Sequence, residues 1–322
     1  MMRRLFVFLL TACLGLAGAL PAAAAPKKEV PVARAEPVVR KATAVSSKPA
    51  TSKSSASAVS KPAPKPAKRE VQEAFPAEDG NGPPSIQAAA AIVLDAQTGK
   101  VLFEHNADDA RPVASTQKLL TALIVAEEGA LDGDVTVQSS DMDAEPSKLY
   151  IKSGEVYGRG KLLQILLVKS MNDVARCLAR DNAGSIEAFA AKMNAKAAQL
   201  GMNTSRFFNP NGLPIPGQYS TARDMSKVAM AAYRNRVIRS IVCQKSVTWR
   251  YNDGRVRTFD TTNQVLRKWP LCNGMKTGYT EAAGHCLISS ASYRGRDIIT
   301  VILGDKKVWD DSYRLLSWGL SS

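Results

Sequence analysis

Three short stretches of the sequence carry residue types that could perform acyl transfer with a serine nucleophile. The first is Ser115-Thr116-Gln117-Lys118. Residues three apart share one face of a helix, so the Lys118 amine can reach the Ser115 hydroxyl and take its proton. A buried amine near other cations loses its own proton more readily, which suits it to act as a base. Alone, this tetrapeptide is as readily a capping serine followed by a surface lysine.

The second stretch is Ser170-Met171-Asn172, which interrupts an apolar run of helical periodicity over residues 162–179. The Ser170 hydroxyl can relay a proton, and the Asn172 amide can hold a substrate carbonyl. An S-x-N turn is also an ordinary cap between two helices. Its meaning therefore depends on the other two stretches.

The third stretch is Lys276-Thr277-Gly278, followed by Tyr279. A lysine beside a hydroxyl suits a substrate carboxylate, and a glycine lets a substrate backbone approach closely. The main-chain N–H of Tyr279 can join that of Ser115 in an oxyanion hole. S-x-x-K, S-x-N and K-T-G each occur once, in this order, and together they match the signature of the penicilloyl-serine transferases.

Histidine chemistry is restricted, because the chain has only His105 and His285. There is no HExxH or CxxC pattern for zinc, and neither histidine accompanies a G-x-S-x-G elbow. We expect no metal and no cofactor, and a serine hydrolase here to use another base. His105 is expected to be exposed at the end of a strand. His285 has no identifiable acidic partner, so we expect a packed or hydrogen-bonded structural role.

The hydrophobic patterns predict the elements that must position these motifs. Two strands come first, then a block of helices, then three strands and a final helix, which indicates a mixed or antiparallel sheet with a helical subdomain. The predicted strands are 88–95, 100–104, 246–251, 286–292 and 297–303, and the predicted helices begin at 115, 162, 186, 221 and 308. Thr221 is the expected cap of its helix, and Arg223 and Asp224 after it are expected to form a buried or interhelical ion pair rather than face the substrate.

On these motifs the chain resembles the low-molecular-mass penicillin-binding proteins, the serine D-alanyl-D-alanine peptidases of family S11. Further likeness lies in residues 193–202, 207–213, 220–224 and 276–285, and the resemblance covers about residues 85–320. It implies an α/β (α+β) fold of the β-lactamase/transpeptidase type, with a mainly antiparallel five-stranded sheet flanked by helices. Met171 is a departure, because relatives often have a small or polar residue there.

The resemblance also implies roles for the first two motifs. Ser115 would be the acylated nucleophile and Lys118 its base. Ser170 would pass a proton toward the leaving amine, and Asn172 would orient the substrate. β-Lactams would acylate the same serine.

For the third motif, the resemblance implies that Lys276 and Thr277 bind the carboxylate beside the scissile bond. Gly278 would let the substrate lie against the strand, and the Tyr279 N–H would complete the oxyanion hole.

Within the family the chain looks most like the D-alanyl-D-alanine endopeptidases, on residues 278–286. Carboxypeptidase members usually carry a further β-rich domain and a membrane anchor, whereas this chain ends soon after its last predicted strand. We therefore expect cleavage of the D-alanyl cross-links of peptidoglycan. The alternative is a carboxypeptidase that removes the terminal D-Ala of stem pentapeptides, and the sequence separates the two poorly.

Other functions fit less well. A β-lactamase would need a Glu-x-x-Leu-Asn element to activate a deacylating water, and we find none. A non-catalytic penicillin-binding sensor would need a signalling domain or several membrane spans. A wall-binding scaffold would not need intact catalytic motifs.

The N-terminus reads as an export signal followed by a tether. Arg3 and Arg4, an apolar run to Leu20 and an alanine-rich exit predict a secretory signal peptide over residues 1–25. A lipidated Cys13 is the less favoured alternative. Residues 26–80 are rich in Lys, Pro, Ala and Ser and predict a disordered linker. Residues 81–322 are then the catalytic domain, in the periplasm or cell envelope.

Most of the net charge of +14 lies in the linker, since residues 26–70 hold eleven Lys or Arg and three Glu. A basic face over the folded part is not implied, and no nucleic-acid-binding motif occurs, so we expect no nucleic-acid partner. The tail could contact an anionic envelope surface or serve only as a tether. Cys177 and Cys286 are expected to be buried hydrophobes, and a Cys243–Cys272 disulfide is left open.

Overall fold

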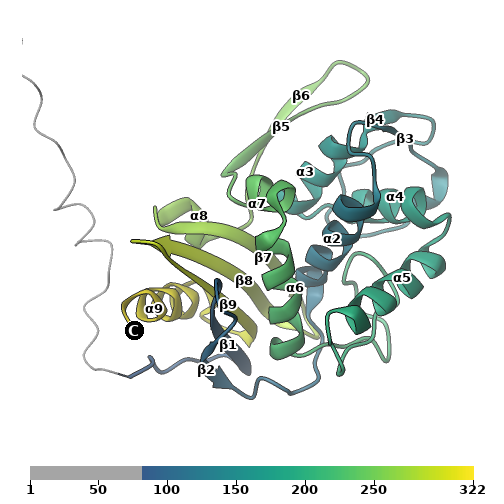
Figure 1. Ribbon diagram of the computed structural model, residues 1–322. Coiled ribbons are helices and arrows are strands. Elements are labelled where there is room, and N and C mark those ends of the chain that lie inside the picture. Colours follow the sequence, from purple (N-terminus) through teal and green to yellow (C-terminus); the bar gives the residue numbers. More distant parts are fainter. Residues whose placement is uncertain (1–81) are drawn as a thin grey trace, which may run out of the picture. The chain divides into compact units, whose positions relative to one another are not determined.

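The computed structural model describes residues 82–322. The predicted signal peptide, with Cys13, and the predicted linker over 26–80 lie outside the described residues. The centre of the described part is a five-stranded antiparallel sheet in the order β2-β1-β9-β8-β7 (Figure 1). Its strands are β1 (Ala90–Asp95), β2 (Val101–His105), β7 (Cys272–Thr280), β8 (Gly284–Tyr293) and β9 (Arg296–Asp305).

Helices cover both faces of this sheet, which explains why successive residues in the middle of its central strands are buried. Successive residues of a strand point to opposite faces. Ile92 packs into the core shared with the helices α2 (Lys118–Glu128) and α6 (Ala222–Arg234), whereas Val93 packs against the terminal helix α9 (Val308–Ser321). The hydrophobic core therefore has two layers, one on each face.

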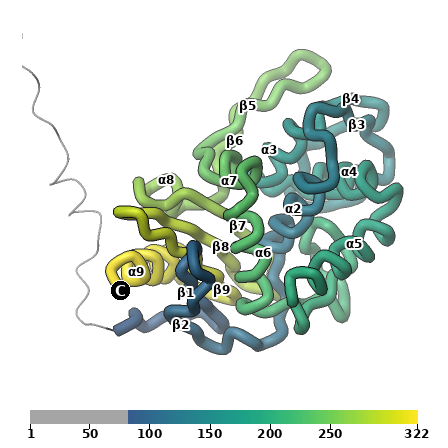
Figure 2. The backbone as a smooth tube through the Cα atoms, in the orientation of Figure 1, coloured from purple at the N-terminus to yellow at the C-terminus, as the bar shows by residue number. Residues whose placement is uncertain are grey.

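A helical subdomain surrounds α2. It contains α3 (Arg159–Lys169), α4 (Asn172–Ala183) and α5 (Ile186–Gln199), with the short 3-10 helix η2 (Ser139–Met142) and the small hairpin β3–β4 (Asp134–Thr136 and Val156–Gly158). Figure 2 shows α2 running between α3, α4, α5 and α6, and all of these helices contact it. Because α2 is buried on every side from Lys118 to Val125, its sequence is apolar all round rather than amphipathic.

The expected fold class is confirmed, as are most of the predicted elements. The hairpin of β1 and β2, the break between α3 and α4, and the helix that Thr221 caps all form. The remaining elements are η1 (Ala114–Gln117), α7 (Arg236–Val242), α8 (Gln264–Lys268), β5 (Ser246–Arg250) and β6 (Val256–Asp260).

One strand of the main sheet was not predicted. The strand predicted over 246–251 does form, as β5, but it pairs only with β6 in a separate hairpin. The fifth strand of the main sheet is β7, which carries the K-T-G motif and was not among the predicted strands. Its two glycines and its lysine break the apolar alternation by which a strand is recognised.

The cysteines of residues 82–322 are all free thiols, so the Cys243–Cys272 disulfide left open above does not form. Cys272 is buried in β7, whereas Cys243 is exposed beyond the end of α7. Cys177 and Cys286 are buried, as expected. Between residues 82 and 322 no helix has both the length and the apolar character needed to cross a membrane.

Candidate active site

The three motifs meet in one cleft of about 880 Å³ between the edge strand β7 and the helical subdomain. The cleft is lined by Ser115, Ser170, Asn172, Thr277, Gly278 and Tyr279, which come from all three stretches. The two lysines of the motifs lie beneath it, with Lys118 fully buried and Lys276 1% exposed. All eight residues singled out from the sequence thus belong to one site.

Lys118 contacts the first serine directly. Ser115 lies in η1 and Lys118 begins α2, and the Lys118 Nζ is 2.7 Å from the Ser115 Oγ. The same Nζ is 2.6 Å from the Asn172 Oδ1 and 2.5 Å from the Asn211 carbonyl oxygen. These three partners are neutral. Burial, with the positive charge of Lys276 as a second cause, holds the pKa of Lys118 well below its ordinary value, against an opposing effect of Asp173. A neutral Lys118 amine can accept the Ser115 proton.

A second lysine contacts the second serine. The Lys276 Nζ donates to the Ser170 Oγ at 2.7 Å and to the Thr277 carbonyl oxygen at 2.8 Å. Burial lowers the pKa of Lys276 to about 7. Ser170 follows the last residue of α3 with a left-handed backbone, φ 71°, which few residues other than glycine adopt. Such strain is found mainly where the position of a side chain matters.

The Asn172 side chain is held from the far side of the cleft. Its Nδ2 donates to the Pro146 carbonyl oxygen at 2.6 Å, and its main-chain N–H donates to the Ser147 carbonyl oxygen at 2.8 Å. The next residue, Asp173, accepts hydrogen bonds from the N–H groups of Leu149 and Tyr150. The loop over residues 146–150 is therefore fixed by the first turn of α4, and Asn172 is left with its Oδ1 toward Lys118.

Two glycines allow main chains to approach the nucleophile. A Cβ atom at Gly278 would lie 2.8 Å from the Ser115 nitrogen and 2.9 Å from the Thr116 nitrogen. At Gly212, where φ is +83°, a Cβ atom would lie 2.1 Å from the Ala114 carbonyl oxygen. Only glycine fits either position. The contact at Gly278 brings the Ser115 N–H against β7, as an oxyanion hole shared between the two segments requires.

Sequence reasoning missed several residues of this site. Asn211 holds Lys118 through its carbonyl oxygen, yet residues 207–213 were noted only for their likeness to the family. The Thr262 hydroxyl lies 2.5 Å from the Thr277 hydroxyl, and Trp309 and Lys169 line the cleft. Gly212 was the available signal, because a glycine in a turn often allows two main chains to lie close together.

His285 differs from expectation. It is exposed rather than packed, lines the cleft and stacks on Tyr279 with the ring centroids 4.6 Å apart. His105 is exposed at the end of β2, as expected.

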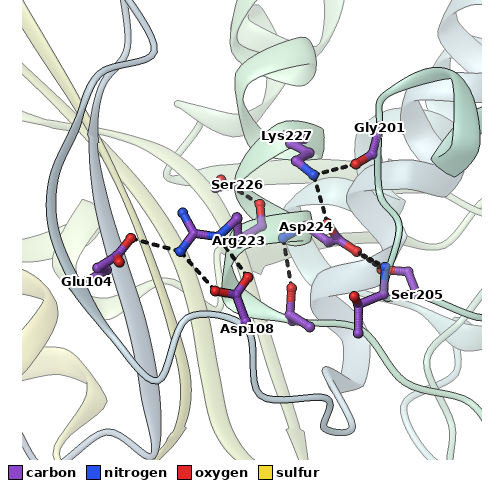
Figure 3. Close-up of polar contacts among 10 residues, drawn as sticks. Glu104, Asp108, Gly201, Ser205, Arg223, Asp224, Ser226 and Lys227 are labelled. Atoms are coloured by element: carbon purple, nitrogen blue, oxygen red, sulfur yellow. Dashed lines mark hydrogen bonds and ion pairs between the residues drawn. The ribbon is translucent and has the colours of Figure 1, made fainter.

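Arg223 and Asp224 form ion pairs outside the residues that line the cleft (Figure 3), but neither pair is of the buried or interhelical kind expected. Arg223 reaches away from α6 to the carboxylates of Glu104 and Asp108, at 2.8 and 2.7 Å. Asp224 is 3.0 Å from the Lys227 ammonium. Among residues 82–322 no group of three or more His, Cys, Asp or Glu side chains is placed to hold a metal ion.

A five-stranded antiparallel sheet, a helical subdomain and a serine–lysine pair between them define the serine DD-peptidases of the penicillin-binding fold. The chain belongs to peptidase family S11, described as D-alanyl-D-alanine carboxypeptidase, whose model matches residues 77–307. It is a serine hydrolase of that family.

Relatives of both specificities are similar to this chain. A D-alanyl-D-alanine carboxypeptidase of Mycobacterium tuberculosis is 34% identical over 238 residues, which are 71% of this chain and 81% of the relative. A D-alanyl-D-alanine endopeptidase of Escherichia coli is 32% identical over 246 residues, 73% of this chain and 78% of the relative. The chain spans 64% of a second carboxypeptidase of Escherichia coli, at 34% identity over 264 residues.

Solved structures of D-alanyl-D-alanine peptidases have the same fold as this chain. The crystal structure of a D-alanyl-D-alanine carboxypeptidase from Mycobacterium tuberculosis superposes with a TM-score of 0.71 at 33% identity, covering 75% of this chain and 94% of that one. A DD-transpeptidase of Streptomyces superposes with a TM-score of 0.70 at 28% identity, covering 75% of this chain and all of that one.

Proposed function

We propose that the protein is an exported D-alanyl-D-alanine endopeptidase that hydrolyses peptidoglycan cross-links through an acyl-enzyme on Ser115. The observation that carries the serine chemistry is the fully buried Lys118 amine, 2.7 Å from the Ser115 Oγ, with a lowered pKa. The relatives named endopeptidases support the choice of bond, and those named carboxypeptidases favour the alternative of trimming a terminal D-Ala.

In the proposed reaction, the Ser115 Oγ attacks the carbonyl carbon of the scissile D-Ala bond while its proton passes to the Lys118 Nζ. The N–H groups of Ser115 and Tyr279 stabilise the oxyanion. The C–N bond then breaks, and the leaving amine takes up a proton through the Ser170 hydroxyl. An ester on Ser115 remains, and water hydrolyses it with Lys118 again as the base.

Substrate binding is assigned to the two ends of the cleft. Asn172 would hold the carbonyl of the acyl side. Thr277, with the Thr262 hydroxyl beside it and the Lys276 ammonium behind it, would bind the carboxylate next to the scissile bond. The lysine behind Thr277 adds positive charge where the substrate is negative.

The three segments predicted from the sequence are proposed to have separate roles. Residues 1–25 direct export, residues 26–80 tether the enzyme, and residues 81–322 are catalytic. The positive charge of the linker would hold the enzyme near anionic envelope surfaces in the periplasm.

The test uses the purified mature protein with D-alanyl cross-linked disaccharide-peptide dimers and, separately, with pentapeptide monomers. We expect dimers to become monomers, and Ser115→Ala to abolish both this cleavage and acylation by a fluorescent penicillin. Ser246→Ala, at an exposed position on β5, is the matched control and should behave as the wild type.

Cleavage of dimers by Ser115→Ala would refute the mechanism. Loss of one alanine from pentapeptides with dimers untouched would make the protein a carboxypeptidase. Rapid hydrolysis of penicillin would instead indicate a β-lactamase.

A further inference from the structure

Lys169 is a cleft-lining cation whose ammonium has no hydrogen-bond or ion-pair partner among residues 82–322. Its side chain is half-buried and lines the same cleft as the motifs. Lys118 and Lys276 are buried and donate to oxygens of the protein. The Lys169 ammonium forms no hydrogen bond and no ion pair with any residue between 82 and 322. An ammonium group in that position is available to an anion that enters the cleft.

The backbone places Lys169 at the end of the cleft where Thr277 lies. It is the last residue of α3, and the next residue, Ser170, is fixed by its N–H bond to the Leu166 carbonyl oxygen at 3.0 Å. The preceding residue accepts a hydrogen bond from the Thr262 N–H at 3.3 Å, and the Thr262 hydroxyl contacts that of Thr277. Lys169 therefore adjoins the group of hydroxyls to which we assign the substrate carboxylate.

The carboxylate side chain that lines the cleft does not neutralise the charge of Lys169. Glu281 is the carboxylate side chain among the lining residues, and it forms no ion pair with Lys169. At the Thr277 end of the cleft, Lys276 is already assigned to the carboxylate beside the scissile bond. A second anion on the substrate would find Lys169 as its counter-ion.

The two candidate substrates differ in this respect. When a terminal alanine is released, the leaving group has one carboxylate, next to the scissile bond. When a cross-link is cut, the leaving group is a whole peptide strand with further carboxylates. Resting on the proposed function, we propose that Lys169 is a specificity-determining residue that binds a second carboxylate of the leaving strand and so favours cross-links over terminal alanine.

The experiment compares three substrates with the full mature enzyme: a cross-linked dimer, the same dimer with the carboxylates of the leaving strand amidated except the one beside the scissile bond, and a pentapeptide monomer. The variants are Lys169→Met, which keeps the apolar stem without the charge, and Lys169→Arg, which keeps the charge. Lys161→Met, at an exposed position earlier on α3, is the matched control.

For the wild type we expect kcat/KM to be about tenfold higher on the free dimer than on the amidated one, the size of a hydrogen bond between charged groups. Lys169→Met should lose this preference and keep its rate on the pentapeptide and its acylation by penicillin. Lys169→Arg should retain the preference, and Lys161→Met should match the wild type.

If Lys169→Met kept the preference for the free dimer, the role of Lys169 would be refuted and the proposed function would stand. An equal loss of kcat/KM on dimer and pentapeptide would have the same meaning. A wild type that trims pentapeptides but cuts no dimers would overturn the proposed endopeptidase function as well. The two failures are therefore distinguishable.

Discussion

The charge on Lys276 lowers the pKa of Lys118, although the two lysines come from different sides of the cleft. Each of these buried amines contacts one serine hydroxyl, Lys118 that of Ser115 and Lys276 that of Ser170. The lysine that would attract the substrate carboxylate thus also lowers the pKa of the proposed base. In the proposed mechanism, substrate binding and base strength are therefore coupled through a single charge.

This coupling predicts how the pH dependence of acylation changes in Lys276→Met. Without the neighbouring positive charge, the pKa of Lys118 rises, so a larger fraction of Lys118 is protonated at low pH and cannot accept the Ser115 proton. The acidic limb of the pH profile should move to higher pH, and the rate should fall further at pH 6 than at pH 9. The measurement is the rate of acylation by a fluorescent penicillin across this range. An equal loss at every pH would show that Lys276 acts on binding alone.

A second prediction concerns the approach of β7 to the nucleophile. In Gly278→Ala the new methyl group would collide with the main chain at Ser115 and Thr116, so the serine must shift. Displacements of about 1 Å at a reacting group cost roughly a hundredfold in rate, and we expect a loss of that order in acylation. Gly158→Ala is the control, because Gly158 has a φ of −60° and its nearest neighbouring atom would be 3.9 Å away. Wild-type acylation by Gly278→Ala would contradict the argument.

The third prediction ranks Arg223 and Asp224, both labelled in Figure 3, by their burial. Asp224 is 3% exposed and accepts from the Thr204 N–H and the Ser205 hydroxyl, both at 2.8 Å, as well as from Lys227. Asp224→Ala leaves these donors unpaired and should lower the free energy of unfolding by about 3 kcal/mol. Arg223→Ala removes a pairing with exposed carboxylates and should cost about 1 kcal/mol.

Urea unfolding measures both values. Neither variant should change penicillin acylation below its unfolding transition, because neither residue lines the cleft. A larger loss of stability in Arg223→Ala than in Asp224→Ala would refute this ranking.

A fourth prediction follows from a buried carboxyl between β9 and α9. Burial, together with neighbouring Asp311, raises the pKa of Asp305 from its ordinary value of 3.8 to about 6. The folded protein therefore binds more protons than the unfolded chain between these pH values, and stability falls as the pH rises through this window. Asp305→Asn is neutral and can still accept from the Lys307 N–H.

We expect Asp305→Asn to raise the free energy of unfolding by about 2 kcal/mol at pH 7 and by much less at pH 4. Urea unfolding at the two pH values checks this. An equal effect at both would mean that the substitution acts through packing rather than charge.

The sequence predicts what depends on local pattern and misses what depends on the approach of distant segments. The helices and the strands β1, β8 and β9 follow from apolar periodicity, and the motif residues follow from spacing. The alternation of polar and apolar residues in β5 predicts a strand but does not indicate its partner. It would be the same whether β5 paired with β6 or joined the main sheet. Asn211 contributes only a carbonyl oxygen, which every residue has, so its type gives no indication of that contact.

The strand order has a consequence for the synthesis of the protein. β1 forms near the start of the described chain, yet its partner β9 comes close to the end, with Ala90 opposite Leu303. Until β9 has been made, β1 has only β2 to pair with, and its other edge has no partner. The sheet can close only after β9 is translated, so the long segment between β1 and β9 must be kept from aggregating until then.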